Sequence, residues 1–113
     1  MHELSITRSV VAIVTEQAAG QRVTRVRLEI GCLSSVMPDA VRFCFDVCAR
    51  GTSAEGAALE IIEIPGRGRC DDCNKETPLT VPAGRCPICT TGRLRPTAGQ
   101  ELNIKEMEVE SCA

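Results

Sequence analysis

Four cysteines arranged as two close pairs are the residues of this sequence best suited to chemistry. Cys70 and Cys73 form one C-x2-C pair, and Cys86 and Cys89 form a second pair after twelve intervening residues. Each tight turn aims two sulfurs at one point, and a hairpin between the pairs brings all four together. The only histidine is at position 2, so a closed site here would consist of four thiolates. This donor set favours a structural Zn²⁺ ion, with a single iron ion or a dithiol redox pair as the alternatives.

The N-terminus is the second candidate metal site. The α-amine of Met1, the amide nitrogen of His2 and its imidazole lie within one short stretch of chain. Together these nitrogens can form fused five- and six-membered chelate rings around a cation. A planar set of imidazole and deprotonated amide nitrogens suits Ni²⁺ or Cu²⁺ better than Zn²⁺. The alternative interpretation is that a histidine in this position is simply a frayed terminal residue.

Composition argues against nucleic-acid and membrane binding. The 113 residues include two phenylalanines and no tryptophan or tyrosine, so several aromatic rings are not available to stack on bases. The net charge is −2, and residues 66–96 carry six basic and three acidic side chains. No apolar run approaches the roughly 18 residues that span a membrane. We therefore expect neither nucleic acid nor membrane as a partner.

The cysteine content and the first residues indicate the cellular compartment of the protein. Eight cysteines without an export signal favour a reducing environment, and Met1-His2-Glu3-Leu4 lacks the basic start and apolar stretch of a signal peptide. We expect the chain to be cytoplasmic. With one histidine and no phosphate-binding glycine loop, the sequence offers no catalytic constellation, and we expect the protein not to be an enzyme.

Hydrophobic periodicity predicts five main elements. A helix over residues 4–19 would bury a stripe consisting of Ile6, Val10, Ile13, Val14 and Ala18. Alternation over residues 23–30 predicts a strand with one wet face. A second helix should begin at Pro38, with Val41, Cys44, Phe45 and Cys48 buried. Two further strands are expected over residues 58–64 and 101–109.

These elements predict an α+β fold. The strand, helix and strand between residues 23 and 64 form a crossover unit, whose strands should be parallel neighbours. The fold class is two helices on a small three-stranded mixed sheet, with an inserted zinc-ribbon-like lobe that holds the four cysteines. We expect residues 1–65 and 97–113 to form the main α/β lobe, and residues 66–96 to form the zinc-binding lobe.

Several segments in order resemble one known family. They are Met1–Ser5 (MHELS), Leu28–Val36 (LEIGCLSSV), Phe43–Asp46 (FCFD) and the double cysteine motif. In these segments the sequence resembles the HypA/HybF family of hydrogenase nickel-incorporation accessory proteins, and the resemblance covers essentially the whole chain. It implies a nickel metallochaperone with a nickel-binding lobe and an inserted zinc lobe.

The resemblance also implies cargo, partners and ligands. Ni(II) would be transiently bound cargo and Zn(II) a structural ion. A HypB-like GTPase and the large-subunit precursor of NiFe-hydrogenase would be partners of a monomer or weak homodimer. Carried over by position, nickel binding falls on His2 with Glu3 beside it, and Asp39 matches an acidic residue near the start of the second helix. The zinc ligands would be Cys70, Cys73, Cys86 and Cys89. The alternative function is a zinc-ribbon adaptor that binds nucleic acid or a protein machine.

Overall fold

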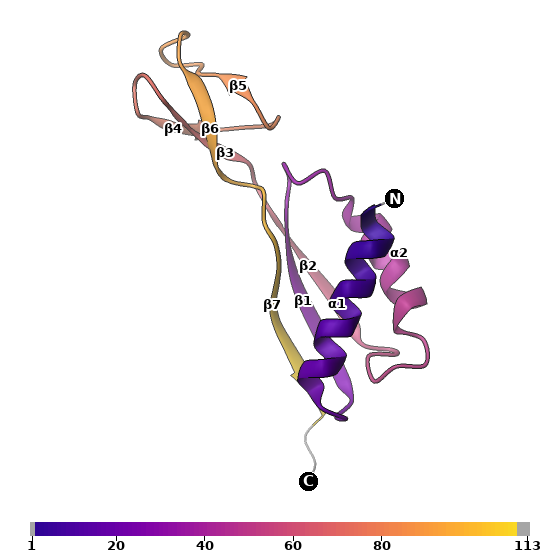
Figure 1. Cartoon of the computed structure of the whole chain (residues 1–113). Coiled ribbons are helices and arrows are strands. Elements are labelled where there is room, and N and C mark those ends of the chain that lie inside the picture. The colour runs from indigo at the N-terminus through magenta and orange to yellow at the C-terminus, as the bar shows by residue number, and fades with distance from the viewer. Residues whose placement is uncertain (1, 111–113) are drawn as a thin grey trace. The chain divides into compact units, whose positions relative to one another are not determined.

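Residue contacts divide the chain into two units that alternate along the sequence. The first comprises the chain up to Leu28, Val36–Ile62 and the chain from Asn103 onward; the second comprises Glu29–Ser35 and Glu63–Leu102. The structure, a computed structural model, describes residues 2–110 and the side chains from Glu3 onward (Figure 1). The second unit thus draws on a short segment ahead of the second helix. The lobe boundaries at residues 65/66 and 96/97 stay a prediction.

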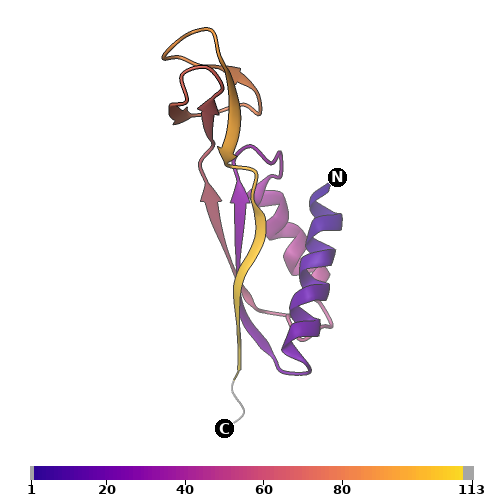
Figure 2. The same ribbon diagram turned by 60° about the vertical axis from the view of Figure 1, so that its left-hand side comes forward.

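Two helices and a three-stranded sheet make up the main α/β part of the chain. Its elements are α1 (His2–Ala18), β1 (Val23–Gly31), α2 (Pro38–Ala49), β2 (Ala58–Ile64) and β7 (Leu102–Val109). The strand order is β2-β1-β7. β1 and β2 run in the same direction and β7 runs against them, with both helices on one face of the sheet (Figures 1 and 2). The mixed sheet and the parallel β1–β2 neighbours confirm the predicted fold class.

The buried face of α1 differs from the predicted stripe. Ile13 is 48% exposed, so its predicted burial is wrong, whereas Thr7 and Val11 are buried. Thr7, Val11, Val14 and Ala18 follow each other at intervals of three or four residues, which makes them one continuous helical face. A threonine can belong to this face because its hydroxyl donates to the Glu3 carbonyl oxygen one turn earlier.

The second helix begins at the predicted residue. Pro38 is its first residue, Asp39 lies in its first turn, and Val41 and Phe45 are buried as predicted. Cys44 and Cys48 are only half-buried, so their prediction as core residues is wrong in degree. Because the helix turns by 100° per residue, these two cysteines lie to one side of the line through Val41 and Phe45 that faces the core.

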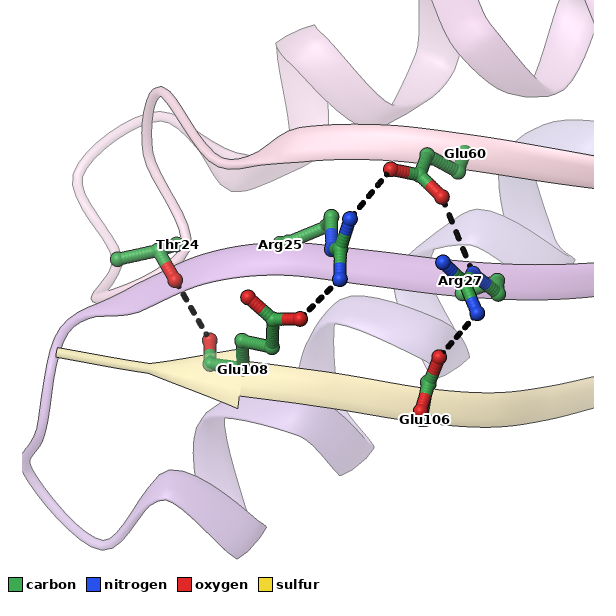
Figure 3. A network of polar contacts seen from close by, with 6 residues as sticks. All are labelled: Thr24, Arg25, Arg27, Glu60, Glu106 and Glu108. Carbon is green, nitrogen blue, oxygen red and sulfur yellow. Dashed lines mark hydrogen bonds and ion pairs between the residues drawn. The ribbon is translucent and has the colours of Figure 1, made fainter.

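Ion pairs connect the three strands of the mixed sheet (Figure 3). The Glu60 carboxylate of β2 accepts hydrogen bonds from Arg25 Nη1 at 2.9 Å and from Arg27 Nε at 3.0 Å, both on β1. On the other side, Arg25 pairs with Glu108 and Arg27 with Glu106, both on β7. The guanidinium of Arg27, followed by that of Arg25, lowers the pKa of Glu60 below its ordinary value. This ladder fixes the register of β2 and β7 on β1.

Removing the shared carboxylate of the ladder should lower thermal stability modestly. Because the folded protein lowers the pKa of Glu60, the stabilisation is complete above the unfolded-state pKa of about 4.3 and is lost as pH falls through the lower folded-state value. We expect Glu60→Gln to melt below the native protein at pH 7, with the gap closing toward pH 3. Melting curves of both proteins across that pH range measure the gap. A constant gap at all pH values would show that the ion pairs contribute nothing.

The second unit contains a four-stranded antiparallel sheet. Its strands are β3 (Arg67–Cys70), β4 (Glu76–Pro78), β5 (Gly84–Arg85) and β6 (Arg93–Ala98), in the order β4-β3-β6-β5. The sequence predicted only a hairpin here, because strands of two to six residues rich in Arg, Gly and Pro carry no clear period. Three leucines, Leu33, Leu79 and Leu94, pack with Cys70 and Cys86 in a small core.

Candidate metal centres

Each cysteine pair lies in a tight turn that follows a strand. Cys70 ends β3 and Cys86 directly follows β5. In both turns the residue after the second cysteine returns its N–H to the first cysteine's carbonyl: Asn74 to Cys70 and Thr90 to Cys86, each at 3.0 Å. Asn74 and Thr90 share the left-handed backbone conformation, with φ of 62° and 66°. The two turns therefore have the same local geometry, although their sequences differ.

The four sulfurs form one cluster of metal-binding size. The Sγ atoms of Cys70 and Cys89 lie 3.5 Å apart, and those of Cys73 and Cys86 lie 3.7 Å apart. All four lie within 4.8 Å of one another. A tetrahedron with Zn–S bonds of about 2.3 Å has sulfur–sulfur edges of about 3.8 Å. The two measured separations match these edges, so the cluster has the size of a Zn²⁺ site.

Backbone N–H groups around the cluster favour anionic sulfur. The N–H groups of Asp72 and Ile88 donate to Cys70 Sγ at 3.3 Å and to Cys86 Sγ at 3.4 Å. Backbone N–H groups of Thr91 and Gly92 lower the pKa of Cys89 to about 6.

The pKa of Cys73, in the same cluster, is shifted in the opposite direction. The N–H of Lys75 favours its thiolate, but burial and the three neighbouring sulfurs raise its pKa to about 11. Four thiolates so close together repel one another, and a bound dication offsets half of their charge. The donor chemistry therefore matches a closed, structural zinc site.

The N-terminal candidate lies where the two helices begin. α1 starts at His2, and the Glu3 carboxylate oxygen Oε2 accepts a hydrogen bond from Met37 N at 3.1 Å. Met37 is the N-cap of α2, and its side chain makes no capping hydrogen bond. Glu3 accepts the N–H of Met37 itself, as the glutamate of a capping box does. Glu3 is 9% exposed, and the Met37 N–H is the main cause that lowers its pKa to about 2. Glu3 thus holds the start of α1 against the start of α2.

Asp39 lies on the same helix start but faces solvent. Its side chain is 94% exposed and pairs with Arg42 at 2.6 Å, one turn along α2. The structure therefore brings the backbone of His2, Glu3 and the segment that carries Asp39 to one end of the helix pair. Met1 lies outside the described residues, and so does the imidazole of His2. The contact between Glu3 and Met37 was not predicted from the sequence. The available signal was an apolar residue directly ahead of the second helix, because the N–H groups at a helix start need an acceptor from elsewhere.

A mixed sheet with two helices, joined in one chain to a four-thiolate cluster, defines a small metal-handling protein. Its similarity to known proteins identifies it further. The family model described as "Hydrogenase/urease nickel incorporation, metallochaperone, hypA" matches residues 1–109. The chain belongs to this family. It is a nickel metallochaperone of hydrogenase maturation and not an enzyme.

Relatives and solved structures agree with this assignment. The chain is 58% identical to the hydrogenase maturation factor HypA of Rippkaea orientalis over 110 residues, which are 97% of this chain and 96% of the relative. It is 57% identical to that of Trichodesmium erythraeum over 113 residues, 100% of this chain and 99% of the relative. The solution structure of the Ni metallochaperone HypA from Helicobacter pylori matches with a TM-score of 0.67 at 22% identity, over 95% of this chain and 96% of that one. This last likeness supports the fold.

In the part of the chain that the structure describes, neither α1 nor α2 combines the length and the apolar character that a membrane-spanning helix requires.

Proposed function

We propose that the chain carries Ni(II) at its N-terminus for delivery to the large-subunit precursor of NiFe-hydrogenase. The α-amine of Met1 and the amide and imidazole nitrogens of His2 bind the ion, with the carboxylates of Glu3 and Asp39 beside it. Cys70, Cys73, Cys86 and Cys89 hold a structural Zn(II) ion. The observation that supports the proposal is the Glu3–Met37 hydrogen bond, which holds Glu3 beside the start of the helix that carries Asp39.

Helix geometry makes the His2 amide available to a metal. The first four N–H groups of a helix have no intrahelical acceptor, and His2 is the first residue of α1. Loss of the amide proton therefore breaks no helical hydrogen bond. The positive ends of the helix dipoles of α1 and α2 favour an anionic amide nitrogen at this position.

The same dipoles limit how tightly a cation is held. Two helix N-termini present positive potential to the ion, while the carboxylates of Glu3 and Asp39 partly offset it. A carrier must release its cargo, so a site with moderate affinity near the surface suits the function. Because the amine (pKa about 8), the imidazole (about 6.5) and an amide must all lose protons, nickel binding should weaken steeply on acidification.

The proposal also includes partners and a compartment. A HypB-like GTPase would act with this chain, which is a monomer or weak homodimer in the cytoplasm. Eight cysteines and a thiolate cluster of metal-binding size support a reducing compartment.

Nickel binding should leave the zinc site intact. We expect Ni²⁺ added to zinc-loaded protein to bind at one ion per chain, release no zinc and produce no strong thiolate-to-nickel charge-transfer bands. A colorimetric zinc chelator and an absorption titration record both quantities in one experiment. Stoichiometric release of zinc would instead identify the cysteines as the nickel ligands and refute the N-terminal site.

A further inference from the structure

Four arginines share one face of the sheet in the second unit. Arg69 on β3 lies directly opposite Arg95 on β6, and Arg85 on β5 lies directly opposite Arg93 on β6. Arg93 and Arg95 are two residues apart on one strand, so their side chains leave the same face. Directly opposed residues of antiparallel strands also share a face, which places all four on it.

One of these arginine pairs is neutralised by the protein itself. Arg69 donates to the Asn74 carbonyl oxygen at 3.0 Å and pairs with Glu76 at 3.4 Å. Arg95 pairs with Asp71 at 2.5 Å. Each guanidinium of this pair thus has an anionic partner within the unit, which offsets the repulsion between two opposed positive charges.

The second pair has no such partner. Among the described residues, neither Arg85 nor Arg93 forms a hydrogen bond or ion pair through its side chain, and both are exposed. Asp72 accepts a hydrogen bond from Thr91 at 3.0 Å and pairs with neither arginine. Like charges directly opposed across two strands destabilise a sheet. The fold therefore carries two guanidiniums whose ten N–H donors are left to solvent or to a ligand.

The unpaired arginines line an open cleft of about 480 Å³. The residues that line it are Ala83, Gly84, Arg85, Thr91, Arg93 and Leu94. Close to Gly84 lies Val81, which is 52% exposed and adds apolar surface: a Cβ placed on the glycine would touch it at 4.0 Å. Two forked cations beside apolar surface can bind carboxylates bidentately while they cover an aliphatic side chain.

We propose that this arginine cleft, defined by Arg85 and Arg93, docks an acidic peptide segment of a partner protein. A single phosphate or carboxylate would leave most of the cleft unfilled, and two exposed arginines hold one small ion weakly because solvent screens them. A segment with several carboxylates and one aliphatic side chain fills the volume and meets both cations. Nucleic acid fits poorly, because residues 66–96 contain no aromatic side chain and few unpaired positive charges.

A labelled peptide tests the proposal directly. The probe is fluorescein-labelled Glu-Glu-Leu-Asp-Glu-Glu, and the reference is Gln-Gln-Leu-Asn-Gln-Gln, titrated by anisotropy against the zinc-loaded full chain. Arg85→Gln/Arg93→Gln should weaken binding of the acidic peptide at least tenfold and reduce its salt dependence. Arg8→Gln/Arg50→Gln makes the same charge change at exposed arginines of the first unit and should bind as the native chain does. Equal binding by both double variants, or by both peptides, overturns the proposal.

A charge reversal separates binding from a structural role. In Arg85→Glu the new carboxylate would face Arg93 across the strands, replacing a repulsive pair by an attractive one. We expect this variant to retain zinc against EDTA at least as long as the native chain and to lose peptide binding. Unchanged peptide affinity in this variant would overturn the proposal.

Other occupants would give different results. If inorganic phosphate displaces the peptide at equal concentration, the cleft takes a small oxyanion and not a peptide. If sedimentation shows self-association that Arg85→Gln/Arg93→Gln abolishes, the occupant is a second copy of the chain. Either result overturns the assignment to a partner's acidic segment. Nickel binding in all these variants should equal that of the native chain, so the test stands apart from the nickel proposal.

Discussion

Adding one residue ahead of Met1 should weaken nickel binding at least tenfold, which corresponds to about 1.4 kcal/mol. The addition turns the α-amine into an amide and moves the free amine one residue away from the imidazole. The side chains of His2 and Glu3 are unchanged, and so is the four-cysteine cluster. Paired Ni²⁺ titrations of native and extended chains measure the loss, with His2→Ala as the reference for complete loss. Intact-mass measurement confirms that the native sample begins with Met1.

Zinc content and melting temperature serve as controls and should be the same in both chains. A site formed from the imidazole ring and carboxylates alone predicts equal affinities for the native and extended chains. Asp39→Asn then identifies that arrangement, because the Asp39 side chain is 94% exposed and its loss disturbs no core contact. Equal affinities in the first comparison, together with a loss in Asp39→Asn, would replace the amine by a carboxylate as the nickel ligand.

Periodicity predicted the elements that bury one face against a common core. Strands 23–30 and 58–64 and the helix at Pro38 agree with β1, β2 and α2 within a residue, because alternation or a helical stripe fixes each of them locally. The face of α1 was less predictable. Ile13 and Val11 are both aliphatic, and tertiary packing selected Val11 together with a threonine whose hydroxyl is satisfied within the helix. The strands β3 to β6 have no such period.

The two metal sites differ in how far the sequence predicts them. C-x2-C spacing encodes a local turn, so the clustering of Cys70, Cys73, Cys86 and Cys89 follows from short-range geometry and one hairpin. The end of the helix pair depends instead on a contact between Glu3 and Met37, which are far apart in sequence. No local sequence pattern predicts such a contact. The nitrogen donors at the N-terminus indicated His2, and the resemblance to a known family added Glu3 and Asp39. The structure supplies the reason that Glu3 is buried.

Loss of one sulfur from the four-cysteine cluster should unfold the second unit and leave the first unit folded. Its core contains three leucines beside the cysteines, and burial of so few aliphatic side chains does not offset the entropy lost when the backbone is ordered. The strands between residues 67 and 98 therefore depend on the metal for stability. Cys73→Ala leaves three thiolates and an open coordination position. We expect zinc content to fall toward zero after EDTA treatment, while the native chain keeps its ion.

Amide NMR spectra and zinc analysis measure the two units separately. In Cys73→Ala the amide signals of residues 67–98 should lose their dispersion, while those of α1, α2 and β1 up to Leu28 keep theirs. Cys32→Ala is the matched control, because Cys32 belongs to the same unit, is exposed and lies outside the cluster. It should keep both zinc and dispersion. Full zinc retention in Cys73→Ala would show that the fourth sulfur is not a ligand. Collapse of the helical signals of α1 and α2 would show instead that the first unit, despite its own aliphatic core, does not fold without the zinc site.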